Sequence, residues 1–147
     1  MTRKEKAEEL FRTGYNCSQS VIGAFCDDFG LDFKTVMKLS EGFGGGFGRM
    51  RLTCGAVSGM VMAVGMLISN ADPKEDTRKE VYAKVHKLCD LFKEKNGSII
   101  CADLLGLTSN TSYSAKPDER NSEYYQKRPC VDCVKDCVEL IENEFGL

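Results

Sequence analysis

Apolar residues along this chain recur at the spacing of helices. One long stretch carries four of them at offsets of four, three and four, on one helix face: Val81, Val85, Leu88 and Phe92. We expect this helix to begin at Asp72-Pro73 and to end at Asn96-Gly97. A final helix opens at Pro129, with an apolar stripe of Cys130, Cys133, Val134, Cys137, Val138 and Ile141. No alternating pattern typical of a strand occurs.

Polar residues mark the starts of the N-terminal helices. Thr2 and Asn16 are each followed three residues later by Glu or Gln, which is the pattern of a capping box. The helix after Asn16 is expected to continue to Gly30, where glycine can end it. Asp32 caps a shorter helix. These signals predict three helices in the first forty or so residues.

The stretch from Thr53 to Ser69 predicts a central helix that is rich in glycine and alanine. Its apolar run is shorter than the ~20 residues that a membrane span needs, so we expect a buried helix. Glycine inside a helix costs about 1 kcal/mol relative to alanine. Gly55 and Gly59 lie on one face, which indicates close approach of another helix, of a cofactor, or of both.

These elements predict an all-α fold, a single-domain bundle of about six or seven helices over residues 1–147 without a β-sheet. The segment from Thr108 to Arg128 is polar and without period, so we expect a loop there. A homodimer is plausible because glycine-lined helix faces can support one.

Composition narrows the range of functions. The formal net charge of -2 gives no general attraction to nucleic acid or anionic lipid. The chain has a single His and no Trp, so a His-rich metal site and a Cys/His hydrolase are both hard to build. No signal peptide is evident at the charged N-terminus, so we expect a cytoplasmic protein. Eight cysteines in a reducing compartment are more often ligands or redox groups than disulfides.

Four cysteines lie where helices are expected to begin: Cys17 after Asn16, Cys54 after Thr53, Cys101 three residues after Ser98, and Cys130 after Pro129. The N-terminus of a helix carries a partial positive charge, which favours thiolate over thiol. If these starts converge, they form an electropositive pocket suited to a metal, an iron–sulfur cluster or thiol redox chemistry. The remaining cysteines, at positions 26, 89, 133 and 137, are interpreted as packing residues.

Five glycines and two arginines fill the segment 41–51. It contains neither a phosphate-binding P-loop nor a dinucleotide-binding motif. The favoured interpretation is that the glycines let backbone pass close to other backbone or to a buried group. The alternative is an anion site built with Arg49 and Arg51.

The segment Cys54-Gly55-Ala56-x-x-Gly59 resembles the central signature of the C_GCAxxG_C_C family, which is described as redox-active. The resemblance spans nearly the whole chain, since Gly14–Gln19, Gly42–Met50 and Gly97–Cys101 are similar to other family segments. Thr53 departs from it, because the family name has Gly before that cysteine.

The resemblance implies a helical domain with four signature cysteines, here Cys17, Cys54, Cys101 and Cys130. It also implies a relation to the non-haem domain of split-Soret-type cytochromes c, for which an iron–sulfur centre has been proposed, and a gene neighbourhood with transporters. Cys133 lies close enough to Cys130 to take its place.

Two redox hypotheses follow from these residues, because four thiolates without His favour an iron–sulfur cluster or an all-cysteine zinc site. The first is an electron-transfer protein in which the four cysteines bind a cluster, most simply [2Fe–2S], with an unknown redox partner. Gly55, Gly59 and Arg49 would then contact the cofactor. The second is a metal-free thiol–disulfide oxidoreductase in which Cys54 is the nucleophile. A non-catalytic accessory to a membrane transporter, and a helical domain whose cysteines only pack, remain as alternatives.

Overall fold

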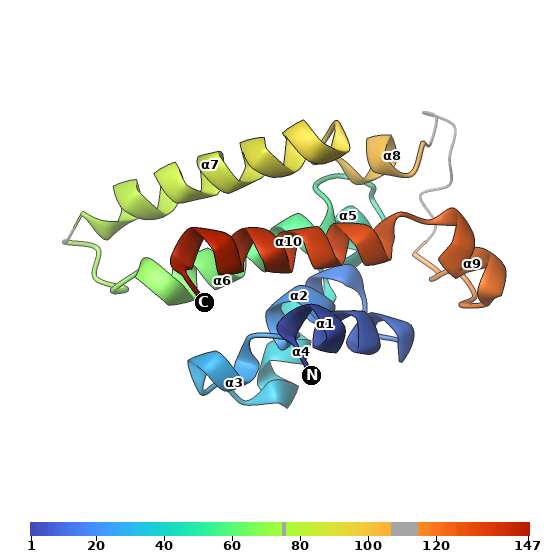
Figure 1. Cartoon of the computed structure of the whole chain (residues 1–147), viewed down its shortest axis with the longest axis horizontal. Coiled ribbons are helices and arrows are strands. Elements are labelled where there is room, and N and C mark those ends of the chain that lie inside the picture. The colour runs from blue at the N-terminus through green and yellow to red at the C-terminus, as the bar shows by residue number, and fades with distance from the viewer. Residues whose placement is uncertain (75, 107–114) are drawn as a thin grey trace.

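A computed structural model describes residues 1–74, 76–106 and 115–147 of the chain. This part of the protein is helical and contains one isolated antiparallel β-bridge, between Thr53 and Ile100 (Figure 1). The all-α prediction is therefore confirmed. The helices are α1 (Arg3–Arg12), α2 (Cys17–Gly23), α3 (Cys26–Phe29), α4 (Phe33–Glu41), α5 (Gly44–Phe47), α6 (Gly55–Ile68), α7 (Thr77–Asn96), α8 (Cys101–Leu104), α9 (Ser122–Lys127) and α10 (Cys130–Phe145).

The glycine- and alanine-rich helix α6 lies at the centre, as expected. It packs against α2, α7 and α10, and its residues Met60, Ala63 and Val64 are fully buried (Figure 1). A Cβ atom added at Gly59 would lie 2.8 Å from the Ser18 carbonyl oxygen, a contact that real Cβ atoms essentially never make. Gly59 therefore allows the backbones of α2 and α6 to approach closely, which is the helix–helix packing that the glycines predict.

Both predicted capping boxes are present, so the cysteine that follows Asn16 occupies the first position of its helix. The Asn16 side chain accepts a hydrogen bond from the Gln19 backbone N–H at 3.0 Å, and the Gln19 side chain accepts one from the Asn16 N–H at 2.9 Å. Asn16 Nδ2 also donates to the Glu41 carbonyl oxygen at 2.8 Å. This residue thus fixes the start of α2 and ties it to the end of α4.

The helices are shorter and more numerous than the sequence predicts. The helix expected from Asn16 to Gly30 is interrupted after Gly23, and α3 forms its second part. The helix expected at Asp72-Pro73 begins only at Thr77, because the Asp72 side chain accepts a hydrogen bond from the Lys74 N–H and makes a local turn. Four of the helices have six residues or fewer and lack room for an apolar period.

The loop expected from Thr108 to Arg128 is in part a helix. Residues 108–114 lie outside the described part of the chain. Residues Ser122–Lys127 form α9, capped by the Asn121 side chain, which accepts from the Tyr124 N–H at 2.9 Å. The rings of Tyr124 and Tyr125 lie 6.3 and 5.9 Å from the ring of Phe11, and these contacts hold α9 against α1. None of the described helices is long and apolar enough to cross a membrane.

Candidate functional site

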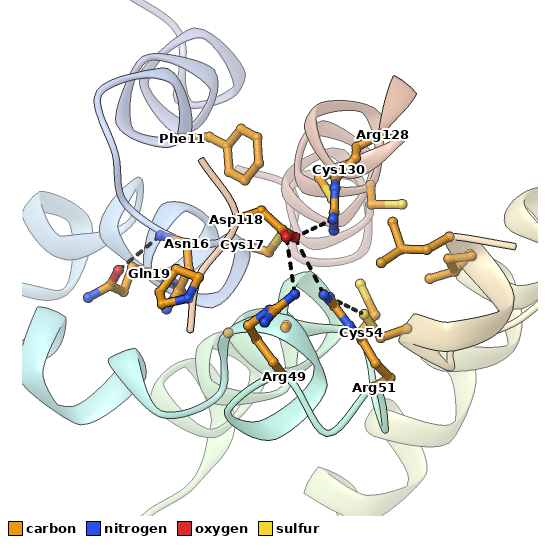
Figure 2. A pocket seen from close by; sticks show the side chains of 18 of the residues that line it. Phe11, Asn16, Cys17, Gln19, Arg49, Arg51, Cys54, Asp118, Arg128 and Cys130 are labelled. Carbon is orange, nitrogen blue, oxygen red and sulfur yellow. Dashed lines mark hydrogen bonds and ion pairs between the residues drawn. The ribbon is translucent and has the colours of Figure 1, made fainter. Parts of the chain in front are cut away.

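A cavity of about 450 Å³ opens where α2, α6, α8 and α10 begin (Figure 2). Five of the eight cysteines line it: Cys17, Cys54, Cys101, Cys130 and Cys133. All eight cysteines are free thiols. The four cysteines that the sequence singles out therefore meet in one place, although they come from segments far apart in the chain.

Cys54 is the N-cap residue of α6, one position earlier in the helix than the sequence predicts. Its thiol is buried, and hydrogen bonding from the Cys133 thiol, followed by the backbone N–H groups of Val57 and Ala56, favours its ionised form. These bonds stabilise the thiolate more than burial disfavours it, and they lower the pKa of Cys54 from 9.0 to about 7. About half of the Cys54 side chains are then ionised at neutral pH.

Cys17 and Cys130 form a second pair of interacting thiols. The hydrogen bond from Cys17 lowers the pKa of Cys130, and the positive charges of Arg128 and Arg120 act in the same direction. The pKa of Cys17 is raised by that same hydrogen bond and by burial. In each pair one thiol, Cys54 or Cys130, has a lowered pKa, and its partner has a raised pKa and stays protonated.

The isolated β-bridge brings Cys54 and Cys101 to the same wall of the cavity. The Cys54 N–H donates to the Ile99 carbonyl oxygen at 2.8 Å, and the Cys101 N–H donates to the Leu52 carbonyl oxygen at 2.6 Å. Burial raises the pKa of Cys101, and Arg51, whose Nη1 lies 3.7 Å from the Cys101 Sγ, opposes that rise.

Two glycines of the signature segments allow the cysteine-bearing backbones to come together. A Cβ atom at Gly46 would lie 2.6 Å from the Leu52 nitrogen and 2.8 Å from the Cys101 Cβ. A Cβ atom at Gly55 would lie 3.3 Å from the Cys17 Cβ. The interpretation that glycines in the segment 41–51 permit close backbone approach therefore agrees with the structure. Gly55 lines the cavity, whereas Gly59 lies away from it, against α2.

Charged side chains also line the cavity. Arg49, Arg51 and Arg128 point toward the carboxylate of Asp118 (Figure 2). Arg120 also lines the cavity, with its guanidinium 4.5 Å from the centre of the Phe11 ring. The sequence identifies Arg49 and Arg51 but misses the other residues, because their segment lacks periodicity and reaches the cavity only in the folded chain.

The lowered pKa of Cys54 agrees with the expected effect of a helix N-terminus, because the Val57 and Ala56 N–H groups at the start of α6 contribute to it. The pKa of Cys130 is also lowered, but by the Cys17 thiol and by the charges of Arg128 and Arg120. Cys17 and Cys101 do not follow the expectation: the Cys130 thiol and burial raise the pKa of Cys17, and burial raises that of Cys101.

Cys133 is interpreted from the sequence as a packing residue and is also named as an alternative to Cys130. Its side chain is buried in the core, as the packing interpretation predicts, but it also lines the cavity, and its interaction with Cys54 is the first cause of its raised pKa. The signal was the Cys130-x-x-Cys133 spacing, because residues three apart share one face of a helix. Cys26, Cys89 and Cys137 contribute to the core or pack against it, as expected.

The described side chains include no group of three or more His, Cys, Asp or Glu residues placed so that it could hold a metal ion. The strongest mutual effects on thiol pKa values are within two pairs, Cys17 with Cys130 and Cys54 with Cys133.

The family described as "Putative redox-active protein (C_GCAxxG_C_C)" matches residues 15–144, a range that includes every cysteine of the cavity. This protein belongs to the C_GCAxxG_C_C family. The description of this family makes redox chemistry the class of function to consider for the cavity. Comparisons with curated proteins and with solved structures gave no match.

Proposed function

We propose that this C_GCAxxG_C_C protein is a thiol–disulfide oxidoreductase whose reacting pair is Cys54 and Cys133. The observation that supports this most directly is that both buried thiols line one cavity that a small molecule can enter, Cys54 at the N-terminus of α6 and Cys133 on α10, which packs against α6. A thiolate with a pKa near the ambient pH is close to the optimum for attack on a disulfide.

The proposed reaction takes two electrons from the protein dithiol. The Cys54 thiolate attacks one sulfur of a small disulfide, the substrate S–S bond breaks, and half of the substrate leaves as a thiolate. Cys133 then attacks the Cys54 sulfur, a Cys54–Cys133 disulfide forms, and the second half leaves. The Cys54 and Cys133 protons end on the two leaving thiols, so one disulfide is reduced and one dithiol is oxidised.

The high pKa of Cys133 is consistent with this second step. Its first cause is the hydrogen bond to Cys54, whose negative charge disfavours a second thiolate beside it. Once Cys54 carries a mixed disulfide, that charge is gone and its contribution to the raised pKa of Cys133 disappears. Formation of the first intermediate therefore activates the second nucleophile.

Trapping the mixed disulfide tests this order of events. In Cys133→Ser the second step is blocked, so hydroxyethyl disulfide should add one mercaptoethanol group to Cys54, detected by intact-mass and peptide mass spectrometry. In the wild type the same treatment should give the internal disulfide and no stable adduct. The matched control is Cys137→Ser on the same helix, because Cys137 does not line the cavity. Adducts on Cys54 in the wild type and both variants alike would exclude Cys133 as the resolving residue.

A second candidate function is electron transfer by an iron–sulfur cluster that Cys17, Cys54, Cys101 and Cys130 would hold. It is favoured by the meeting of all four signature thiols at one cavity, with Gly55 and Arg49 also lining it. Four thiolates are the usual ligands of such a cluster, which would supply one-electron chemistry. The described side chains are not placed to hold a metal ion as they stand, so the thiols would have to move toward one another on binding. Arg51 beside Cys101 would offset part of the negative charge of a bound cluster.

Cys101 distinguishes the two candidates, since it is a ligand in the second and does not react in the first. Protein purified without air should be assayed for iron, acid-labile sulfide and visible absorption, in the wild type and in Cys101→Ala. Iron and sulfide that are present in the wild type and lost in the variant would support the cluster. Colourless, iron-free protein that forms the Cys54–Cys133 disulfide equally well with and without Cys101 would support thiol–disulfide exchange.

A further inference from the structure

Three arginine side chains converge on one carboxylate at the edge of the cavity. Arg49 Nη2 lies 3.2 Å from Asp118 Oδ1, Arg51 Nη2 lies 3.7 Å from Asp118 Oδ2, and Arg128 also pairs with Oδ2 (Figure 2). The arginines are largely buried, with side chains 17%, 11% and 22% exposed, whereas Asp118 is 38% exposed. Arg49, Arg51 and Arg128 therefore form a largely buried cationic cradle around the more exposed Asp118 carboxylate.

The backbone that positions two of these arginines is strained. Arg49 and Arg51 have φ values of 67° and 63°, in the left-handed region that non-glycine residues rarely adopt, and Phe47 between the glycines has 64°. Each such residue costs about 1–2 kcal/mol. Strain that is retained at several positions of one loop is typical of functional sites. Here the strained loop places the Arg49 and Arg51 guanidinium groups at the cavity.

The charges around the cavity favour an anion. The lining residues include four arginines and two carboxylates, Glu41 and Asp118, in a chain whose formal net charge is -2. Arg51 Nε is buried and has no hydrogen-bond partner among the described residues. The cradle can therefore donate at least one more hydrogen bond, from Arg51 Nε, while Asp118 occupies it.

Arg120 has a different part in this arrangement. Its guanidinium donates to the carbonyl oxygens of Phe11 and Tyr15, the latter at 3.0 Å, and lies over the rings of Phe11 and Tyr124. Arg120 thus anchors the Asp118 segment to the end of α1. The segment can remain attached there if the Asp118 carboxylate leaves the three arginines.

We infer that Arg49, Arg51 and Arg128 form a binding site for the carboxylate of a small disulfide substrate, and that Asp118 occupies this site in the free protein. The inference rests on the proposed thiol–disulfide function. Arg51 lies between the cysteines and the arginine cradle, because its Nη1 is 3.7 Å from the Cys101 Sγ while its Nη2 faces Asp118. A carboxylate held by these arginines would lie in the cavity that Cys54 and Cys133 also line.

The geometry favours a carboxylate as the ligand, because a carboxylate of the chain itself already fills the cradle. Planar guanidinium groups match the two oxygens of such a group. A cavity of about 450 Å³ suits a small molecule, within the usual range of roughly 300–1,000 Å³ for ligand pockets. The substrate class is therefore a small disulfide with a carboxylate a few bonds from its sulfur.

Three disulfides of similar size and different charge test the inference: dithiodipropionate, hydroxyethyl disulfide and cystamine, which are anionic, neutral and cationic. The rate of Cys54 modification by each is divided by the rate of the same disulfide with free mercaptoethanol, which removes intrinsic reactivity. The wild type should prefer the anionic reagent over the neutral one by at least about tenfold. That preference should fall in Arg128→Gln and in Arg49→Gln.

Two further variants separate local binding from general charge. Asp118→Asn removes the internal competitor and should increase the rate with dithiodipropionate but not with hydroxyethyl disulfide. Arg12→Gln removes the same charge from a side chain that is half exposed and pairs with Glu8, and it should leave the preference unchanged. Propionate should slow the reaction of dithiodipropionate and leave that of hydroxyethyl disulfide unchanged.

The outcomes for the two proposals are distinct. Equal normalised rates for all three disulfides, with no effect of propionate, would overturn the carboxylate site and leave the thiol–disulfide function intact. A preference lost equally in Arg12→Gln would also overturn it, because long-range attraction would then be the cause. Failure of Cys54 to react with any disulfide would instead refute the proposed function.

Discussion

Replacement of Cys133 by alanine tests the hydrogen bond that prepares Cys54 for reaction. That bond is the largest cause of the low pKa of Cys54, which lies near 7 where the ordinary value is 9.0. A hydrogen bond to a charged group contributes about 1.5–3 kcal/mol, which corresponds to roughly one to two pKa units. The Ala56 and Val57 N–H groups remain in the variant, but burial opposes them. We therefore expect the pKa of Cys54 in Cys133→Ala to rise to between about 8 and 9.

The assay is alkylation of Cys54 by iodoacetamide across a range of pH, with the labelled peptide quantified by mass spectrometry. Below pH 7 the wild-type thiol is mostly protonated and should react slowly, and the rate should level off above that pH. The midpoint of this curve is the quantity to compare. A single rate at neutral pH would understate the change, because a thiolate of higher pKa is intrinsically more nucleophilic by several-fold.

Cys137→Ala is the matched control. Cys137 lies one turn further along α10 and is fully buried, but Cys54 is not hydrogen-bonded to it. Its removal should destabilise the core by about 1 kcal/mol or somewhat more and leave the Cys54 midpoint near 7. The reasoning is refuted if Cys133→Ala keeps the wild-type midpoint, or if both variants shift it equally, since packing would then set the pKa.

Three further predictions concern the backbone around the site, and the free energy of unfolding in urea measures each. Gly46→Ala should lose more than about 2 kcal/mol, because the residue has a φ of 68° and its Cβ would lie 2.6 Å from the Leu52 nitrogen; a stability within about 0.5 kcal/mol of the wild type would contradict this. Asn16→Ala should lose about 1–2 kcal/mol, since the N-cap of α2 and the bond to the Glu41 carbonyl both go, while Asn16→Asp, which retains a capping oxygen, should recover part of the loss. Ala71→Gly should gain up to about 1 kcal/mol, because this exposed alanine has a φ of 63°; an equal gain in Ala83→Gly, at an exposed position within α7, would show that relief of strain is not the cause.

Local signals in the sequence predicted those helices whose start is decided within four residues. The capping boxes at Thr2 and Asn16 are satisfied by neighbours three positions away, so no distant contact is needed to fix them. The predicted start of α7, at Asp72-Pro73, was wrong because the same kind of local hydrogen bond stabilises a turn there instead of a helix. Side chains of Asn70 and Asp72 accept from the Asp72 and Lys74 N–H groups and form turns where proline indicated a first helical position.

The meeting of four cysteines at one cavity was a hypothesis that helix starts alone could not establish. It depends on the bridge between Thr53 and Ile100 and on glycines whose role becomes visible only when another backbone lies against them. The pairing of Cys54 with Cys133 depends on how α10 is rotated against α6, which is a property of the packed core. Asp118 and Arg128 reach the cavity from a segment without helical or strand periodicity.

The central claim is that two thiols of this cavity exchange electrons as a unit. The most direct measurement is differential alkylation of all eight cysteines after the metal-free protein has equilibrated in a series of thiol–disulfide buffers. We predict that Cys54 and Cys133 lose labelling together, at one buffer composition, while Cys26, Cys89 and Cys137 stay labelled throughout. If every cysteine stays labelled, or if each is lost independently as a mixed disulfide with the buffer thiol, the claim is contradicted.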